Sequence, residues 1–209
     1  MEDRNIIIID NFYSDADEVV KEAKKLEYRT DVVGGHFDRT CGMPFGDFQK
    51  GLIPYLEKYI GRDIAIDSTW TDTENWNNIN GSFYKTHESV TPNHIHHDWS
   101  DWTGVVYLSK NLPPNVGTQF WRHKETQADF FFDNNDSYGN YNDKLEKPYD
   151  NRGEDEGRKD FERTDFVSYK YNRLLLFRGT MFHSADFPDN MEIGSRFNQI
   201  FYFNIANPP

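Results

Sequence analysis

Two histidines and an aspartate stand at positions where extended backbone would gather them into a metal site. His96 and Asp98 are separated by one residue, so their side chains point the same way if the segment is extended. His183 follows the apolar run 174–177 through a short phrase, at a position where a strand would end. Imidazole nitrogens and carboxylate oxygens are ligands of divalent transition metals. We therefore take His96, Asp98 and His183 as candidate metal ligands.

Such a ligand set suits redox chemistry better than a structural role. Two histidines and one carboxylate on one face of an octahedron leave three positions open, an arrangement associated with oxygen-activating iron(II) rather than structural zinc. Two open positions can take the 2-oxo acid end of 2-oxoglutarate, and the third can take dioxygen. The far carboxylate of 2-oxoglutarate needs a bidentate cation when it is buried. Arg196, which opens an aromatic run, is the candidate for that role.

The other histidines have weaker claims to a metal. The motif His36-x-Asp38 shows that such pairs arise by chance, and His94-x-His96 would suit zinc only with a third ligand and a general base nearby. His97 alternates away from its neighbours, so we expect it outside the metal ligands. No spacing suggests a partner for the remaining two, His87 and His123.

The elements that must position these residues are predicted to be short strands from residue 62 onward. Runs rich in β-branched and aromatic residues predict strands at 64–70, 79–85, 103–108, 118–122, 166–171, 173–177 and 197–205. This number of short strands favours a sandwich or a barrel. The candidate ligands then fall beside strand ends.

Upstream of these strands, the sequence predicts one strand and two supporting helices. A β-branched run at 6–9 predicts the strand, and Ser14 with Asp17 offers a capping-box-like start to a helix that carries apolar residues as far as Leu26. A second helical period runs over 48–59 until Gly61 stops it. Pro54 either kinks this helix or marks its true first turn.

The length of the chain predicts one compact domain over residues 1–209. We expect the N-terminal strand and supporting helices in 1–62 and the β core in 64–205. Residues 133–165 are polar and show no apolar periodicity, which predicts a long surface loop, either a functional lid or a disordered insertion.

Composition argues against several classes of protein. Asp and Glu number 35 against 23 Lys and Arg, and the net charge of -12 works against binding a phosphate backbone. No apolar run approaches the roughly 20 residues of a membrane helix, and the N-terminus lacks the order of a signal peptide. The single cysteine, Cys41, cannot form an intramolecular disulfide. We expect a cytoplasmic protein that binds neither nucleic acid nor membrane, and the oligomeric state stays open.

Together these residues resemble the iron(II)/2-oxoglutarate dioxygenase superfamily, and specifically its prolyl-hydroxylase-like branch. The resemblance covers about residues 76–205. It rests on the order His96-x-Asp98, Thr103-x-x-x-Tyr107-Leu108, Gly117-Thr118-x-Phe120, the run 173–177 leading to His183, and Arg196-Phe197 before 201–203. The phrases 9–13 and 117–123 also resemble a branch of uncharacterised oxygenases of bacteria and phages. The chain departs from better-known hydroxylases in having one glycine before Thr118 and in its long polar insertion.

The resemblance implies a mainly β fold with flanking helices, built on a double-stranded β-helix (jelly-roll, cupin-like) core. It implies iron(II) as cofactor and 2-oxoglutarate and dioxygen as co-substrates, with Tyr107 and the upstream Tyr84 joining Arg196 in holding or facing 2-oxoglutarate. It implies hydroxylation with release of succinate and CO2, and we expect the substrate to be a peptide, amino acid or small metabolite. Demethylation or desaturation would use the same residues, whereas Asp98 disfavours halogenation because halogenating members have a small residue there.

Alternatives remain for the function and for single residues. The first alternative is a non-catalytic double-stranded β-helix binding protein with a vestigial metal site, although no ligand type is lost. A zinc-dependent hydrolase would need an acid or base beside a bound water, and no spacing singles one out. Arg196 could instead form a surface salt bridge, and Tyr107 could be a core residue. Three tryptophans are expected in the core rather than in a substrate platform: Trp99, Trp102 and Trp121.

Overall fold

Two antiparallel sheets make up most of the computed structural model, which describes residues 5–29, 39–42, 48–71, 80–86, 95–131, 159–186 and 196–207. The larger sheet has the strand order β1 (Ile6–Asp10), β8 (Arg173–Arg178), β5 (Trp102–Tyr107), β10 (Arg196–Phe203), β4 (Ser82–Thr86), β3 (Arg39–Gly42) and β2 (Tyr28–Arg29). The smaller sheet has the order β7 (Phe161–Ser168), β6 (Gly117–His123) and β9 (His183–Asp186). The fold is the predicted mainly β jelly-roll core with flanking helices.

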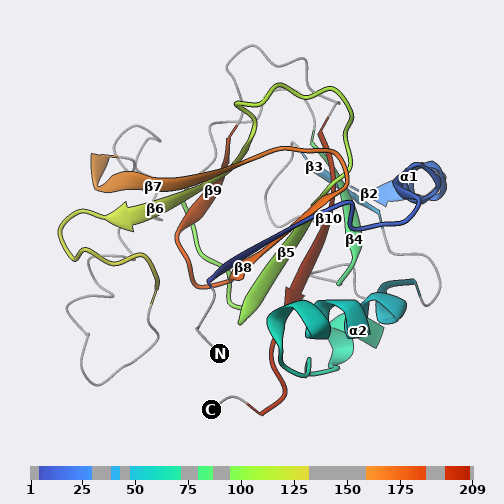
Figure 1. The fold of residues 1–209 in the computed structure, drawn as a ribbon, viewed down its shortest axis with the longest axis horizontal. Helices are drawn as coiled ribbons and strands as arrows, with labels where there is room; N and C mark the ends of the chain where they lie inside the picture. Colours follow the sequence, from blue (N-terminus) through green and yellow to red (C-terminus); the bar gives the residue numbers. More distant parts are fainter. Residues whose placement is uncertain are drawn as a thin grey trace.

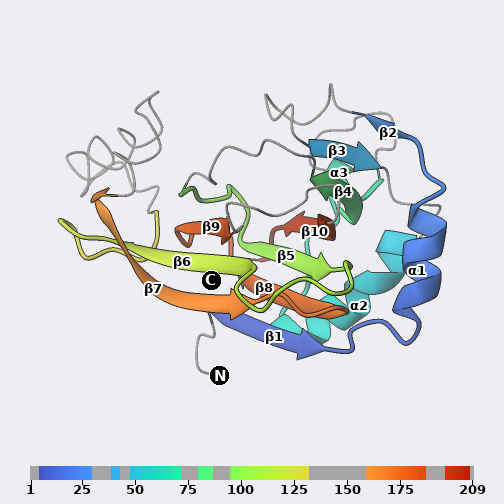
Figure 2. The same ribbon diagram turned by 90° about the horizontal axis from the view of Figure 1, so that it is seen from above.

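The helices and the smaller sheet cover opposite faces of the larger sheet. In Figures 1 and 2, α1 (Ala16–Ala23) and α2 (Phe48–Ile60) lie on one side of it, and the sheet of β6, β7 and β9 lies on the other. A short third helix, α3, spans Ser68–Thr71. No helix among the described residues is long and apolar enough to cross a membrane.

The period of two along the central strands sorts their side chains between two cores. On the helix side, the buried residues include Val106, Leu174, Leu176, Phe201 and Phe203. Between the sheets, the buried residues include Val105, Tyr107, Phe120, Leu175 and Phe177. Each such side chain contributes roughly 1.5–3 kcal/mol by burial. Because neighbouring residues of a strand point to opposite faces, burying one set of side chains fixes the face on which the other set lies. The polar residues of β10 that alternate with its phenylalanines therefore face the space between the sheets.

Four predicted strands are confirmed to within two residues, namely those at 103–108, 118–122, 173–177 and 197–205. The strand predicted at 64–70 is wrong. Only Ile64 pairs there, in an isolated bridge with Ile205, and the chain then turns into α3. The Asp67 carboxylate accepts a hydrogen bond from the Thr69 amide at 2.9 Å, which favours a helical turn over an extended chain.

Two other strands begin away from their predicted positions. The strand predicted at 79–85 begins at Ser82, because Asn80 and Gly81 form a turn in which Gly81 has a φ of 81°. The strand predicted at 166–171 is β7, which begins at Phe161, inside the predicted polar loop. It begins there because Phe161 is buried and pairs with His123. The prediction of a surface loop for 133–158 lies outside the described residues. Three short strands were not predicted: β2, β3 and β9.

Both predicted helices are present, with small differences at their ends. Asp15 caps α1, accepting a hydrogen bond from the Glu18 amide at 2.9 Å, so the cap is neither Ser14 nor Asp17. Pro54 lies inside α2. Gly61 ends α2 as predicted, with a φ of 70° that costs glycine nothing.

Asp10 at the end of β1 gives a pH-dependent contribution to stability. Its carboxylate accepts from Arg173 at 2.6 Å and from Lys170 at 2.7 Å, and these bonds lower its pKa to about 2. A lowered carboxyl pKa stabilises the fold above the unfolded pKa, and that stability is lost as the pH falls through the folded pKa. Asp10→Asn should lower the free energy of unfolding by about 1 kcal/mol at pH 7, because the pair is partly exposed.

The difference between wild type and Asp10→Asn should stay constant from pH 7 to about pH 4 and then shrink toward pH 2. Urea unfolding at pH 7, 5, 4 and 3 measures it. A difference that stays the same at pH 3 as at pH 7 would contradict the assignment of the lowered pKa to Asp10.

Candidate metal centre

Backbone pairing alone brings the two candidate histidines together. The His96 amide donates to the His183 carbonyl at 2.9 Å, and the His183 amide donates to the His96 carbonyl at 2.8 Å. Residues that exchange both bonds lie directly opposite each other on antiparallel chains. Their ring centroids are accordingly 4.2 Å apart. His183, the first residue of β9, therefore lies directly opposite His96, and the two histidines belong to one site.

Asp98 is fixed by the end of β8. Its amide donates to the Gly179 carbonyl at 2.7 Å, and the Gly179 amide donates to the Asp101 carbonyl at 3.1 Å. One ligand atom from each of His96, Asp98 and His183 lies within 4.8 Å of the other two. Among the residues that the structure describes, this is the one group of three or more such side chains close enough to hold a metal ion.

The His183 ring already presents the nitrogen that a metal would need. Its Nδ1 lies 2.8 Å from the Met181 carbonyl, which can only accept, so Nδ1 carries the proton. In the neutral ring Nε2 then has a free lone pair, and it lies 3.5 Å from Asp98 Oδ2. A backbone carbonyl on the outer nitrogen is the usual way in which proteins orient a metal-binding histidine.

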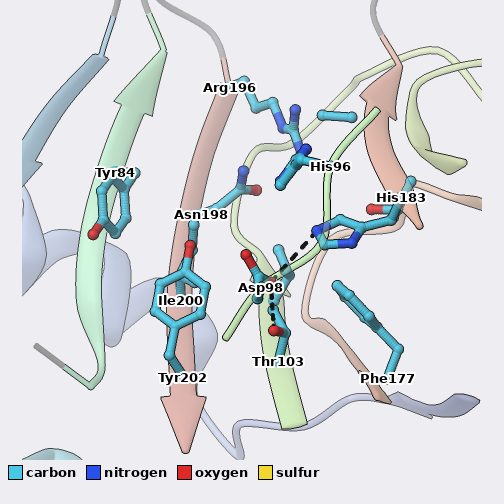
Figure 3. A pocket seen from close by; sticks show the side chains of 13 residues that line it. Tyr84, His96, Asp98, Thr103, Phe177, His183, Arg196, Asn198, Ile200 and Tyr202 are labelled. Atoms are coloured by element: carbon cyan, nitrogen blue, oxygen red, sulfur yellow. Dashed lines mark hydrogen bonds and ion pairs between the residues drawn. The ribbon is translucent and has the colours of Figure 1, made fainter. Parts of the chain in front are cut away.

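The three candidate ligands open into a cavity of about 70 Å³ between the sheets. Figure 3 shows their side chains converging on one region of it, with Arg196 and Asn198 of β10 beside them. The other lining residues are Tyr84, Thr103, Val105, Thr118, Phe177, Ala185, Ile200 and Tyr202. The volume corresponds to roughly five water molecules, so the enclosed part suits a small ligand.

Arg196 is a buried cation held in place by its own strand. The residue is 6% exposed, and its Nε donates to the Asn198 side-chain oxygen at 2.9 Å. The Asn198 nitrogen in turn donates to the Tyr169 hydroxyl at 3.1 Å. Tyr169 also donates to the Phe197 carbonyl and accepts from the Leu108 and Ser109 amides. A guanidinium so placed favours an anion in the cavity.

The two tyrosines predicted to hold or face 2-oxoglutarate differ in their position relative to the cavity. Tyr84 lines the cavity, but Tyr107 is fully buried, with its ring stacked on Tyr169 and its hydroxyl 2.7 Å from Thr118 Oγ1. Burial raises the pKa of Tyr107 to about 12, so its hydroxyl stays neutral. Thr118 lines the cavity and Tyr107 does not, so a role for Tyr107 in holding 2-oxoglutarate stays a prediction. The signal for Thr118 is its spacing of two residues from the buried Phe120, which puts both side chains on the same face of β6.

The remaining histidines are separate from the cluster. His97 stacks on Phe131 with ring centroids 4.1 Å apart, and burial lowers its pKa. The prediction that it lies outside the metal ligands is consistent with this position. His123 is buried against Phe161 and bonds to Thr126. The other predicted positions lie outside the described residues: His36, Asp38, His87 and His94.

The tryptophans were expected in the core, and one of them is not. Trp102 is buried on the helix side, and Trp121 is partly buried and donates to Ser184. Trp99 is 77% exposed, so the expectation is wrong there. Trp99 falls on the same side of the extended segment as His97, away from Asp98, which turns it out of the cavity.

Gly179 lies where no side chain fits. A Cβ on Gly179 would come within 2.1 Å of the Ser100 carbonyl oxygen, so the segment that carries Asp98 would have to shift. Gly179→Ala should therefore lower the affinity for Co²⁺ at least about 10-fold and lower Tm. Metal titration and thermal melting measure both. Gly51→Ala is the matched control, since its Cβ meets nothing within 4 Å and alanine favours the helix. Equal metal affinity in the two variants would contradict the prediction.

The fold and the site define a class: an antiparallel double-stranded β-helix with a His, Asp and His cluster between its sheets. Residues 89–199 match the model of a family described as a family of unknown function (DUF6445). The match covers more than half of the chain, so the chain belongs to this family. No curated protein sequence matches the chain.

Solved structures similar to this chain have low sequence identity to it. The crystal structure of SnoN, a non-heme alpha ketoglutarate dependent epimerase from nogalamycin biosynthesis, has a TM-score of 0.51 and 13% identity, covering 95% of this chain and 77% of SnoN. Two structures of HygX from Streptomyces hygroscopicus are 12% identical and cover 97% of this chain and 83% of theirs. Their TM-scores are 0.43 with iron bound and 0.45 with nickel and 2-oxoglutarate bound. At 13% identity, the likeness to SnoN is one of fold.

Proposed function

We propose that the protein is an iron(II)- and 2-oxoglutarate-dependent oxygenase. It hydroxylates a peptide, amino acid or small metabolite and releases succinate and CO2. The observation that carries this proposal is that a His, Asp and His cluster and a buried arginine line one small cavity. The cluster alone would fit several metals and several chemistries. The arginine beside it supplies an anchor for a carboxylate, which a zinc hydrolase or a vestigial site has no need of.

The donor set fits iron(II). His96 and His183 offer imidazole nitrogens and Asp98 offers a carboxylate, which is the set that binds non-haem iron(II) and leaves positions open for other ligands. His183 Nδ1–H donates a hydrogen bond to the Met181 carbonyl, which leaves Nε2 as the nitrogen that would bind a metal. Asp98 is held by Thr103, whose Oγ1 donates to Asp98 Oδ2 at 2.5 Å.

Arg196 and its neighbours fit the far carboxylate of 2-oxoglutarate. The guanidinium is planar and its donors match a carboxylate in bidentate fashion. Asn198 accepts from Arg196 Nε at 2.9 Å, which fixes the orientation of the guanidinium beside the cavity. Thr118 lines the same cavity, and its hydroxyl bonds to that of Tyr107.

Bound iron(II) would supply the activation of dioxygen that couples oxidative decarboxylation of 2-oxoglutarate to oxidation of the substrate. The chain itself orients the two ends of the co-substrate and shields them from bulk water, because Arg196 and His183 are both more than nine-tenths buried. SnoN, a protein of the same fold, is a non-heme alpha ketoglutarate dependent enzyme, so the fold can carry this chemistry.

The test is succinate formation and metal-dependent binding of 2-oxoglutarate. Metal-free protein is given ferrous iron and 2-oxoglutarate without oxygen, and air is then admitted. We expect slow release of succinate even without the substrate, and none when a chelator replaces the iron. If 2-oxoglutarate does not bind in the presence of ferrous or manganous ion, the proposal is wrong and the non-catalytic alternative holds.

A further inference from the structure

One neutral side chain beside the cluster is bound to a candidate ligand by a very short hydrogen bond. Thr103 is the second residue of β5 and lines the cavity, yet it is only 2% exposed. Its Oγ1 lies 2.5 Å from Asp98 Oδ2, and the Ser100 hydroxyl lies 3.3 Å from Thr103 Oγ1. Figure 3 shows the bond between Thr103 and Asp98 as a dashed line, next to the one that joins Asp98 to His183.

The direction of these bonds follows from their chemistry. An ionised carboxylate only accepts, so Thr103 donates its one proton to Asp98. The Thr103 oxygen can then only accept from Ser100. A hydrogen bond from a hydroxyl to a carboxylate is short and about twice as strong as a neutral one. The hydroxyl takes one lone pair of Asp98 Oδ2, the oxygen that also lies 3.5 Å from His183 Nε2, so it fixes the side of the carboxylate that faces the candidate metal site.

The Thr103 hydroxyl cannot easily swing away from Asp98. Threonine is β-branched, so its χ1 is restricted in a strand. Thr103 pairs with Phe177 on β8 and with Tyr202 on β10, which places it in the middle of the larger sheet. A donor fixed in this way holds the Asp98 carboxylate in one orientation.

We infer that Thr103 is a positioning residue that holds the Asp98 carboxylate in one orientation and so keeps it from turning to bind the metal through both oxygens. This inference rests on the proposed function, because it matters for a metal that must keep three positions open. A carboxylate that turned to bind through both oxygens would occupy one of those positions. The 2-oxo acid end of 2-oxoglutarate needs two of them, so Thr103 protects the binding of the co-substrate as well as that of the metal.

The test compares three threonine variants in the intact protein. Thr103→Val should lower the affinity for Co²⁺ about 10- to 100-fold, as loss of an outer partner of a ligand does. It should also weaken the visible absorption that appears when a 2-oxo acid chelates ferrous iron without oxygen. Thr103→Ser keeps the hydroxyl and should restore both signals. Thr118→Val is the matched control, because Thr118 lines the same cavity and bonds to Tyr107 rather than to Asp98, and it should keep wild-type affinity for Co²⁺.

The outcomes separate this inference from the proposed function. If wild type binds Co²⁺ and Thr103→Val binds it equally well, the positioning role is wrong and the metal site stands. If Thr103→Val and Thr118→Val lose Co²⁺ affinity alike, the effect is not specific to Asp98 and the inference is also wrong. If wild type binds no metal, the proposed function fails first. Thr103→Ala replaces Thr103→Val if thermal melting shows that the valine variant does not fold.

Discussion

His183→Ala is expected to abolish stable metal binding and, with it, succinate formation. His183 is 7% exposed and its Nε2 faces Asp98, so alanine removes one of the three candidate ligands from a buried position. The loss in affinity for Co²⁺ should exceed about 100-fold, since partners of the ligands alone are worth 10- to 100-fold. Metal content after reconstitution and dialysis measures the first effect, and succinate release measures the second.

A second histidine variant controls for general damage. His123 is also buried, but it bonds to Thr126 and packs against Phe161 instead of facing the cavity. His123→Gln should therefore keep metal binding, apart from some loss of stability. Stoichiometric metal in His183→Ala together with undiminished succinate release would overturn the assignment of His183 as a ligand.

Arg196→Leu is expected to remove binding of 2-oxoglutarate while leaving metal binding intact. Truncating one partner of a buried, hydrogen-bonded charge pair costs about 2–5 kcal/mol, which is a roughly 30-fold or larger rise in Kd. Arg196→Lys should fall between leucine and wild type, because lysine keeps the charge but loses the bidentate geometry. Titration of 2-oxoglutarate into manganese-loaded protein without oxygen measures all three.

The control for Arg196 is an arginine on the smaller sheet. Arg122 forms an ion pair with Asp129 at 2.8 Å, and both side chains are partly exposed. Arg122→Leu should leave the Kd for 2-oxoglutarate unchanged. An unchanged Kd in Arg196→Leu would mean that the co-substrate is anchored elsewhere or is not 2-oxoglutarate, whereas loss of metal in the same variant would point to misfolding of β10.

Together, His183→Ala and Arg196→Leu distinguish the metal-binding part of the candidate site from the part that binds the far carboxylate. His183→Ala should lose both ligands, since the 2-oxo acid end of the co-substrate binds through the metal. Arg196→Leu should lose only the co-substrate. This order of loss is the signature of a site in which one end of a ligand is held by a metal and the other by a protein cation.

The local pattern of the chain determined the fold and the identity of the candidate ligands. Runs of β-branched and aromatic residues predicted β5, β8 and β10, because such residues favour strands. The spacing His96-x-Asp98 placed two ligands on one side, because side chains two residues apart in extended backbone point the same way. These signals are short in range, so they can be read from neighbouring residues.

Where local signals compete, the sequence was a poorer guide. Residues 64–70 carry a strand-like pattern, but the cap formed by Asp67 and the burial of Trp70 against Phe201 and Phe203 favour a helical turn. β9 is only four residues long. The sequence identified His183 as a candidate ligand but did not predict a strand there. Tertiary packing overrides weak propensities in such short segments.

Only the tertiary structure decided how the site is held together. The backbone exchange between His96 and His183, the bond from Thr103 to Asp98 and the support of Arg196 by Asn198 join residues from different strands. The sequence named the groups that could do chemistry, but hydrogen bonds across a sheet depend on strand order and register. Those are set by which hydrophobic faces pack together over the whole chain, and no local pattern encodes that choice.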